Sequence, residues 1–271
     1  MKFFFERDVP KPDLRTPRPT ILPAKHGLSG SALYRHSRLG GDFFDFVPIS
    51  ATRMLLLLSD IAGRRDEALH IAAILQDALY EHAPRLLKDA DANVSDAVTE
   101  LALDLNRVII QAAGGVRPAP TFIGCLDEQF GLIHYISAGH PPAFIRSDAE
   151  VIELAPTGLP FGLFSHATHD AAVSVVQPGA SIVLTSKGVV ESTAGRKEYG
   201  VDGIRRFLEE HTFLSPQHLC RELLDSAVKF SQQPSTFGPQ FSIAGFRSAQ
   251  EPNDMTVVCL MRAAKLAAAS A

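Results

Sequence analysis

The sequence predicts an α+β fold in a single domain, and three observations carry that prediction. Residues 53–60, RMLLLLSD, form a short apolar run that is typical of a strand buried on both faces. Two helical patterns follow, over 66–89 and from Asn93 to the Gly114-Gly115 pair. Short strand-like segments separated by turns occupy much of the rest. This order of elements predicts sheets with helices packed on their outer faces.

The three predicted helices have clear signals. The helix over 66–89 keeps its apolar residues on one broad face. The second helix begins near Asn93 and carries Asp96 in its first turn, where a carboxylate suits the positive end of the helix dipole. Ser215-Pro216 predicts a third helix, because a capping residue is followed by proline at the first helical position.

Strand-like segments fill most of the chain after the second helix. Turn signals separate several of them, as in an antiparallel meander. The segments are residues 120–126, 130–137, 143–147, 151–154, 171–176 and 181–185, with a final core strand at 255–261. Residues 231–254 are polar and rich in glycine and proline, so we expect a surface loop there.

The ends of the chain differ from its middle. Residues 10–23 contain five prolines, which remove backbone donors and disfavour a helix or a central strand. We therefore expect an N-terminal arm over 1–26, one domain over 27–262 and a tail over 263–271. The N-terminal MKFFFERDV lacks the apolar stretch of a signal peptide.

Composition excludes several classes of protein. The chain has 271 residues, a formal charge of −4 and a sequence pI near 6.2, which gives no electrostatic reason to expect a nucleic-acid partner. Its three cysteines have no metal-binding spacing and are expected to be reduced and largely buried. No run approaches the ~20 apolar residues of a membrane helix. We expect a soluble, cytoplasmic protein without a membrane partner.

Several acidic residues lie in turns or at the expected ends of strands. They are Asp42 and Asp45 in GGDFFDF, Asp60 in LLLLSDIAG, and Asp254 beside Asn253. Such residues can converge from distant parts of the chain, and Mg²⁺ and Mn²⁺ prefer carboxylate, carbonyl and water ligands. Each residue alone is more often a turn or cap residue than a ligand.

The motifs taken together resemble a known family. GGDFFDF, LLLLSDIAG, TFIGCLDEQFGLIHYISAGHPPAFI, GLPFGLF, GASIVLTSKGVVES and NDMTVVCLM occur in that order, from about Gly27 to Met261. This set resembles the PPM metal-dependent protein phosphatases, in the SpoIIE/RsbU-like branch. The resemblance implies a β-sandwich of two antiparallel sheets flanked by helix pairs, with two Mn²⁺ or Mg²⁺ ions at one end. It also implies a phosphoserine or phosphothreonine substrate on a small regulatory protein, such as an anti-sigma-factor antagonist.

The resemblance assigns roles to individual residues. It places a metal-binding acid on Asp42, with Asp45 next in line, and the bridging aspartate and following carbonyl on Asp60 and Ile61. Asp42 and Asp60 are thereby the expected catalytic residues. Asn253 and Asp254 stand at the positions of the two aspartates in the family's DD(I/M)T motif.

Two of the family's aspartates are replaced. The family's TDG is SKG here, so Lys187 stands at a metal-ligand position, and Asn253 replaces the first aspartate of the DD(I/M)T motif. The two replacements change the formal charge of the ligand set by +3, two units for Asp to Lys and one for Asp to Asn. An ammonium does not bind a divalent ion unless it loses a proton, and beside aspartates its charged form is favoured. Lys187 is predicted to neutralise Asp42 or Asp60 in place of a metal; the alternative is that it extends into solvent.

Three further residues have two interpretations. Arg64 and Arg65 are candidates for binding phosphate through bidentate hydrogen bonds, or are a solvated helix start. His140 in SAGHPP suits proton transfer chemically, but a structural turn is the favoured interpretation.

The sequence leaves two functions open. One is a SpoIIE-like serine/threonine phosphatase domain with weakened metal-dependent hydrolysis of a phosphorylated regulatory protein. The other is an inactive pseudophosphatase that binds such a partner. The family resemblance also makes the helix pair at 66–113 a candidate surface for a homodimer or for regulation.

Overall fold

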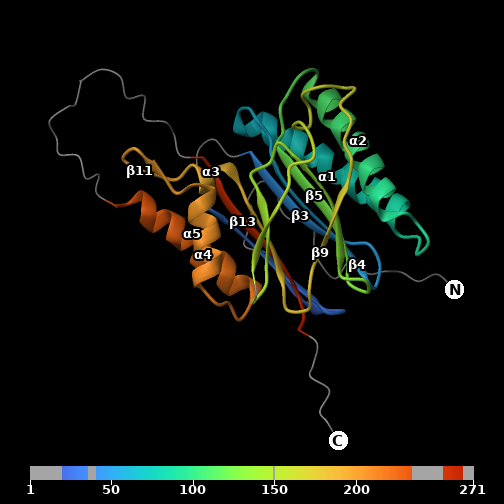
Figure 1. The fold of residues 1–271 in the computed structure, drawn as a ribbon. Coiled ribbons are helices and arrows are strands. Elements are labelled where there is room, and N and C mark those ends of the chain that lie inside the picture. Colours follow the sequence, from blue (N-terminus) through green and yellow to red (C-terminus); the bar gives the residue numbers. More distant parts are fainter. Residues whose placement is uncertain (1–19, 36–40, 149, 234–252, 265–271) are drawn as a thin grey trace, which may run out of the picture.

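Two antiparallel sheets pack face to face, and a helix pair covers the outer face of each (Figure 1). The computed structural model describes residues 20–35, 41–148, 150–233 and 253–264. The four layers confirm the predicted α+β sandwich. The helices and strands of each layer pack through the apolar faces that their sequences provide.

The first sheet has six strands in the order β1-β2-β13-β10-β7-β8. β13 lies beside β2 and β10, although more than 60 residues separate it from either in the sequence. The bounds are Thr20–Lys25 for β1, Leu28–Arg35 for β2, Met255–Arg262 for β13, Ser181–Thr185 for β10, Ala143–Arg146 for β7 and Val151–Leu154 for β8.

The second sheet has five strands in the order β3-β4-β5-β6-β9. β4 and β5 are central and almost entirely buried, which explains the unbroken apolar run predicted at 53–60. The bounds are Asp42–Pro48 for β3, Arg53–Asp60 for β4, Thr121–Asp127 for β5, Leu132–Ala138 for β6 and Ala172–Val175 for β9.

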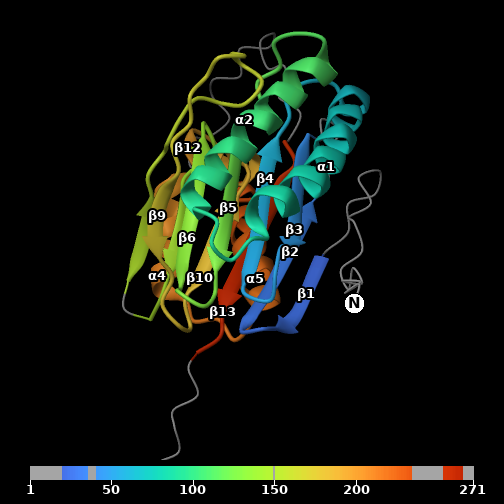
Figure 2. The ribbon, with the colours of Figure 1, turned by 90° about the vertical axis from the view of Figure 1, so that its right-hand side faces the viewer.

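Helices α1 (Arg65–Leu87) and α2 (Val94–Ala113) cross the outer face of the five-stranded sheet (Figure 2). The Asn93 side chain accepts hydrogen bonds from the backbone N–H of Ser95 and Asp96, which fixes the start of α2 as the sequence predicts. Gly114 ends α2 in the left-handed conformation, with φ of 64°.

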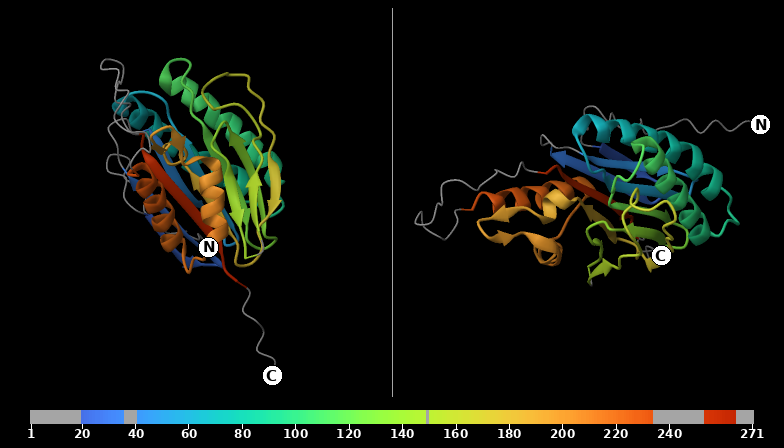
Figure 3. Two further views of the ribbon diagram at one scale, coloured as in Figure 1. Left: turned by 60° about the vertical axis from the view of Figure 1, so that its left-hand side comes forward. Right: turned by 90° about the horizontal axis from the view of Figure 1, so that it is seen from above.

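Helices α4 (Gly200–Glu210) and α5 (Pro216–Ser231) cover the outer face of the six-stranded sheet (Figure 3). Ser215 caps α5 as predicted, by accepting a hydrogen bond from the His218 N–H. The one-turn helix α3 (Lys187–Val190) and the short ribbon of β11 (Thr193–Ala194) and β12 (Lys197–Glu198) connect β10 to α4.

Three apolar clusters hold the layers together. One joins α1 and α2 to the five-stranded sheet, one lies between the sheets, and one joins α4 and α5 to the six-stranded sheet. Cys125, Cys220 and Cys259 are buried in these clusters as free thiols. Within the described residues, no helix is long and apolar enough to cross a membrane.

The sheet begins earlier than the sequence suggested. Thr20–Lys25 lies within the arm predicted over 1–26, yet it forms edge strand β1 and pairs with β2. The register shifts between Leu22 and Lys25, around Pro23, and an edge strand with an irregular register tolerates a proline that lacks an N–H. Residues 1–19, most of the predicted loop at 231–254 and residues 265–271 lie outside the described parts.

Candidate functional site

Asp42 and Asp60 lie side by side at one end of the sandwich. They are direct partners in the pairing of β3 with β4, at the end where α1 begins. The backbone N–H of Ile61 donates to Gly41 O at 2.9 Å. A Cβ at Gly41 would lie 2.3 Å from the Ile61 carbonyl oxygen, so this approach requires glycine. The structure thus brings together three of the residues that the family resemblance selects: Asp42, Asp60 and Ile61.

The Asp42 carboxylate joins the two sheets. Thr256 Oγ1, on β13 of the six-stranded sheet, donates to Asp42 Oδ2 at 2.6 Å. Burial and the negative charge of Asp60 raise the pKa of Asp42 well above its usual value. Burial also raises the pKa of Asp60, and the Lys187 ammonium opposes that rise. The pair therefore holds protons more tightly than exposed aspartates do.

Asn253 and Asp254 precede β13, and their side chains bind different partners. Asp254 is buried, and its Oδ2 accepts a hydrogen bond from Tyr34 Oη at 2.5 Å. Burial and Asp254 raise the pKa of Tyr34, so its hydroxyl remains a donor. The Asn253 amide instead donates to Glu191 Oε2 at 3.2 Å.

Lys187 forms its ion pair with Glu191. The Lys187 ammonium lies 3.3 Å from Glu191 Oε1, and its side chain is 54% exposed. Lys187 is the first residue of α3 and Glu191 is its C-cap, and this spacing of four residues places them on one helix face. Lys187 therefore acts on Asp60 through its charge, while its direct partner is a carboxylate that our sequence analysis did not select.

Asp45 lies on the other face of β3. Its carboxylate accepts hydrogen bonds from Gln76 Nε2 at 3.1 Å, from Tyr80 Oη at 3.3 Å and from the Phe46 N–H at 2.8 Å. Two of these donors belong to α1. Residues three apart on a strand face opposite sides, so Asp45 does not join Asp42 and Asp60.

The predicted phosphate-binding arginines lie at the start of α1. Arg64 is exposed at the N-cap position, and Arg65 donates a hydrogen bond to the Tyr34 hydroxyl. Arg117 adds a third guanidinium, which pairs with Glu67 at 3.1 Å and donates to Ala62 O at 3.3 Å. Three guanidinium groups thus lie around the start of α1, together with Asp66 and Glu67 of its first turn.

His140 is a packed structural residue. Its Nδ1 lies 2.7 Å from Pro141 O, and a carbonyl only accepts, so Nδ1 carries the proton. Burial lowers the pKa of His140 to about 4, which keeps the ring neutral at pH 7. The ring packs edge-on against Phe122.

The donor set does not fit a pair of divalent ions. Asp42, Asp60 and the Ile61 carbonyl offer oxygen ligands at one edge, but Asp254 is bonded to Tyr34, and Lys187 and Asn253 are turned to Glu191. Nowhere in the described ranges are three His, Cys, Asp or Glu side chains grouped so that they could hold a metal ion. A site for two hard cations needs more anionic oxygen than this arrangement supplies.

Sequence reasoning missed Glu191, Tyr34 and Thr256. Glu191 had a local signal, since it lies four residues after Lys187 on a helical turn. Tyr34 and Thr256 had none, because their contacts with Asp254 and Asp42 join residues more than 200 positions apart.

Comparisons with known proteins agree with this fold. The model of the family described as "Stage II sporulation protein E (SpoIIE)" matches residues 50–262. Phosphoserine phosphatase RsbU of Bacillus subtilis is 24% identical over 213 residues, which are 78% of this chain and 61% of RsbU. Protein IcfG of Synechocystis is 22% identical over 215 residues, which are 33% of IcfG. The chain thus spans about three fifths of one relative and one third of the other.

Solved structures have the same fold. The RsbU and RsbW domains of Rv1364c from Mycobacterium tuberculosis superpose with a TM-score of 0.67 and 22% identity, over 90% of this chain and 64% of that one. The PP2C phosphatase domain of B. subtilis SpoIIE gives 0.62 and 16%, over 89% and 64%. RsbX in complex with magnesium gives 0.60 and 12%, over 91% and all of that chain. The match to the family model over most of its length shows that the chain belongs to the SpoIIE family, in the RsbU-like branch of the PPM-type phosphatases.

Proposed function

We propose that this chain binds a phosphorylated regulatory protein and that its metal-dependent hydrolysis of the phosphomonoester is strongly weakened. One observation carries the proposal: Lys187 and Asn253, which replace two family aspartates, both bind the Glu191 carboxylate. The replaced positions are thus joined to each other through a third residue. That arrangement opposes the binding of a second divalent ion.

Charge supports the weakening. Divalent affinity at oxygen sites rises with the number of anionic ligands. Lys187 brings a positive charge near Asp60, which opposes the binding of a further cation there. When bound, divalent ions activate water and neutralise the phosphoryl oxygens in this class of reaction. A site that binds them poorly loses that contribution.

The partner is proposed from the relatives and from the arginines at the start of α1. RsbU is described as a phosphoserine phosphatase, and an RsbW domain accompanies an RsbU domain in Rv1364c. Arg64 at the exposed start of α1 is suited to bind phosphate oxygens, since guanidinium forms bidentate bonds with them. Arg65 supports the same site by holding Tyr34 against Asp254. We therefore propose a phosphoserine or phosphothreonine on a regulatory protein.

The second candidate function is binding of the partner without any hydrolysis. The contacts of Lys187 and Asn253 with Glu191 favour it as well. In that case the chain is a pseudophosphatase that holds its partner without changing it. The two candidates differ in residual turnover, which a single assay measures.

The test compares the native chain with Lys187→Asp/Asn253→Asp. Mn²⁺ binding is measured by calorimetry, and hydrolysis of p-nitrophenyl phosphate is measured with Mn²⁺ present. We expect weak Mn²⁺ binding and low turnover in the native chain, and gains of at least about tenfold in both in the double variant, which corresponds to about 1.4 kcal/mol. Equal binding and turnover in the two proteins would overturn the proposal.

Two controls make the result specific. Lys197→Asp makes the same change of charge as Lys187→Asp, but on β12, and we expect it to leave Mn²⁺ binding and turnover unchanged. Asp60→Asn added to the double variant is expected to remove the gain. Residual native turnover that Asp60→Asn abolishes identifies a weakened enzyme; turnover that is zero, or that Asp60→Asn leaves unchanged, identifies a pseudophosphatase.

A further inference from the structure

Strand β9 is an unpaired edge of the five-stranded sheet. It pairs with β6 on one side, and within the described residues no strand lies along its other side (Figure 2). A strand at the edge of a sheet presents a row of backbone N–H and carbonyl groups that can pair with another chain. β9 is therefore a candidate surface for strand pairing.

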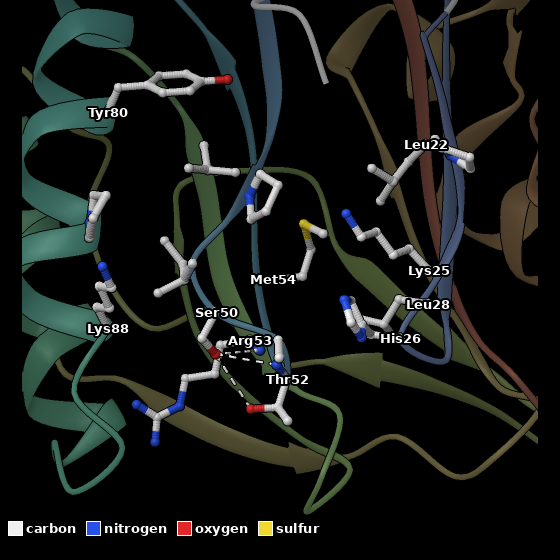
Figure 4. Close-up of a pocket in the computed structure, with 16 residues that line it drawn as sticks. Leu22, Lys25, His26, Leu28, Ser50, Thr52, Arg53, Met54, Tyr80 and Lys88 are labelled. Carbon is white, nitrogen blue, oxygen red and sulfur yellow. Dashed lines mark hydrogen bonds between the residues drawn. The ribbon is translucent and has the colours of Figure 1, made fainter. Parts of the chain in front are cut away.

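The other edge strands of the two large sheets carry features that oppose such pairing. β3 contains two aspartates and ends in Pro48, and β8 contains Glu153. β1 contains Pro23 and ends in Lys25, which extends toward Met54 in a pocket of about 250 Å³ (Figure 4). Charged residues and prolines are common means by which edge strands avoid pairing with other chains. β9, with the sequence AVSV, has neither.

The register with β6 shows which backbone groups of β9 point outward. The Val176 N–H donates to Gly131 O at 2.7 Å, which makes these two residues a hydrogen-bonded pair. They continue the register of β9 with β6 by one step. In an antiparallel ladder, hydrogen-bonded and non-hydrogen-bonded pairs alternate, so the N–H and carbonyl groups of Val173 and Val175 point away from β6. Within the described residues, no hydrogen bond reaches either valine from that side.

The side chains of Val173 and Val175 lie on the outer face of the sheet and are half exposed. Val173 is opposite His134, whose Nδ1 lies 2.8 Å from Ser95 Oγ of α2, so this face is the one that carries the helix pair. The exposed fractions of the two valines are 49% and 50%. Two exposed β-branched residues beside outward-pointing backbone groups favour another apolar strand as the partner.

We propose that β9 pairs in antiparallel fashion with β9 of a second copy of this chain. A two-fold axis through Ser174 places Val173 of each copy opposite Val175 of the other. Both positions have outward-pointing backbone groups, so each such pair exchanges both of its N–H···O bonds. In this register Asp170 faces Pro178 of the other copy, so like charges are not opposed. The strand is thus complementary to itself, and the two five-stranded sheets join into one.

The contact is small, because β9 has only four residues. Interfaces of limited area are weak and transient, so we expect a dimer that forms at high protein concentration. Pairing of β9 involves neither the acidic site nor a phosphorylated partner. Its test is therefore separate from the test of the proposed function.

Sedimentation velocity of the full chain between about 5 and about 500 μM measures the dimer, whose fraction rises with concentration by mass action. Val173→Lys/Val175→Lys should raise the Kd of the dimer at least about tenfold, because the ammonium groups repel each other across the paired edges. Val116→Lys/Leu159→Lys adds the same charge at other residues, which are 70% and 52% exposed, and should dimerise like the native chain. A native chain that stays monomeric, or a dimer that the lysines in β9 leave unchanged, would overturn the proposal.

An introduced cysteine tests the register. Ser174 would meet Ser174 of the second copy at a non-hydrogen-bonded position, where Cα atoms are about 4.5 Å apart, a distance that a disulfide spans. Ser174→Cys should therefore form a disulfide-linked dimer with oxidised glutathione, which takes up the two electrons and two protons and leaves as two thiols. Ser165→Cys, at an exposed position, is the matched control and should link far more slowly, while the native cysteines are buried. Circular dichroism checks that every variant is folded. Equal linking of the two cysteine variants would refute this pairing.

Discussion

Asp45 and Asp42 are three residues apart on one strand, but they have different roles. Asp42 faces the inside of the sandwich end, and Asp45 accepts three hydrogen bonds beneath α1. The Asp45 carboxylate is buried, and these donors hold it in place. Side chains alternate between the two faces of a strand, so Asp45 faces α1 while Asp42 faces the other sheet. The family resemblance alone did not distinguish these two positions.

Asp45→Ala is expected to lower the free energy of unfolding by about 2 to 3 kcal/mol, because Gln76 and Tyr80 lose a charged acceptor. Urea unfolding measures this loss. Mn²⁺ binding in the Lys187→Asp/Asn253→Asp background should be unchanged by it. A variant that keeps its stability but loses that binding would instead make Asp45 a ligand.

His140 should make stability depend on pH. Burial lowers its pKa from 6.5 to about 4, so the unfolded chain binds more protons between these values. Its contribution to stability is complete above pH 6.5 and is lost as pH falls to about 4. The difference between the two pKa values corresponds to about 3 kcal/mol.

His140→Asn retains a donor for Pro141 O and removes the titration. Unfolding free energies of the native chain and the variant, measured between pH 7 and 4, should therefore converge as pH falls. Parallel curves would show that His140 does not titrate in this window.

At the scale of elements, α3 is held against the start of β13. A Cβ at Gly188 would lie 2.1 Å from Asp254 O, so the helix and the strand meet backbone to backbone. Ser186 Oγ, at the N-cap of α3, accepts from the Thr256 N–H at 2.9 Å. These contacts fix the position of Lys187 relative to Asn253.

Gly188→Ala should displace α3 from β13 and destabilise the protein by more than 2 kcal/mol, as overpacking against backbone does. Gly114→Ala is the matched control: a Cβ there meets nothing within 4 Å, and the cost of about 1 kcal/mol comes from positive φ alone. Thermal unfolding of both variants checks the difference. An equal loss of stability in the two variants would mean that α3 can move away from β13 without destabilising the protein.

The elements that could be predicted were those with strong periodicity or clear caps. Residues 53–60 match β4 at both ends, and Asn93 and Ser215 cap α2 and α5 as expected. The prolines led us to predict an arm where β1 forms. At the edge of a sheet, pairing with β2 outweighs the loss of one backbone N–H donor at Pro23. At the site, family motifs selected Asp42, Asp60 and the two replaced aspartates. They did not reveal that both replacements bind Glu191, since that depends on how β13 and α3 meet.

At the scale of the whole molecule, the acidic site lies where the two sheets meet. β3 and β4 supply Asp42 and Asp60, and the six-stranded sheet supplies Thr256 and Tyr34. A metal bound there would link the sheets and stabilise the folded state by mass action.

Mn²⁺ should therefore raise the melting temperature of Lys187→Asp/Asn253→Asp by several degrees at about 100 times its Kd, where binding contributes about 2.7 kcal/mol. The native chain, with a Kd at least about tenfold higher, should rise by no more than about half as much at the same concentration, because binding at ten times Kd contributes about 1.4 kcal/mol. Differential scanning fluorimetry gives both values. A rise of the same size in the native chain would contradict the weak site that we propose.

Glu191 also constrains the order in which the two replacements could be reversed. Lys187→Asp alone puts a second carboxylate beside Glu191 and removes the cation that balances it. Asn253→Asp alone puts a carboxylate where the amide now donates. Each single reversal therefore adds repulsion before a metal is bound to offset it, so the combined effect of the two cannot equal the sum of the separate ones. Without a bound metal the double variant carries both repulsions and is less stable than either single variant, so any benefit of reversing both residues depends on the metal that they bind.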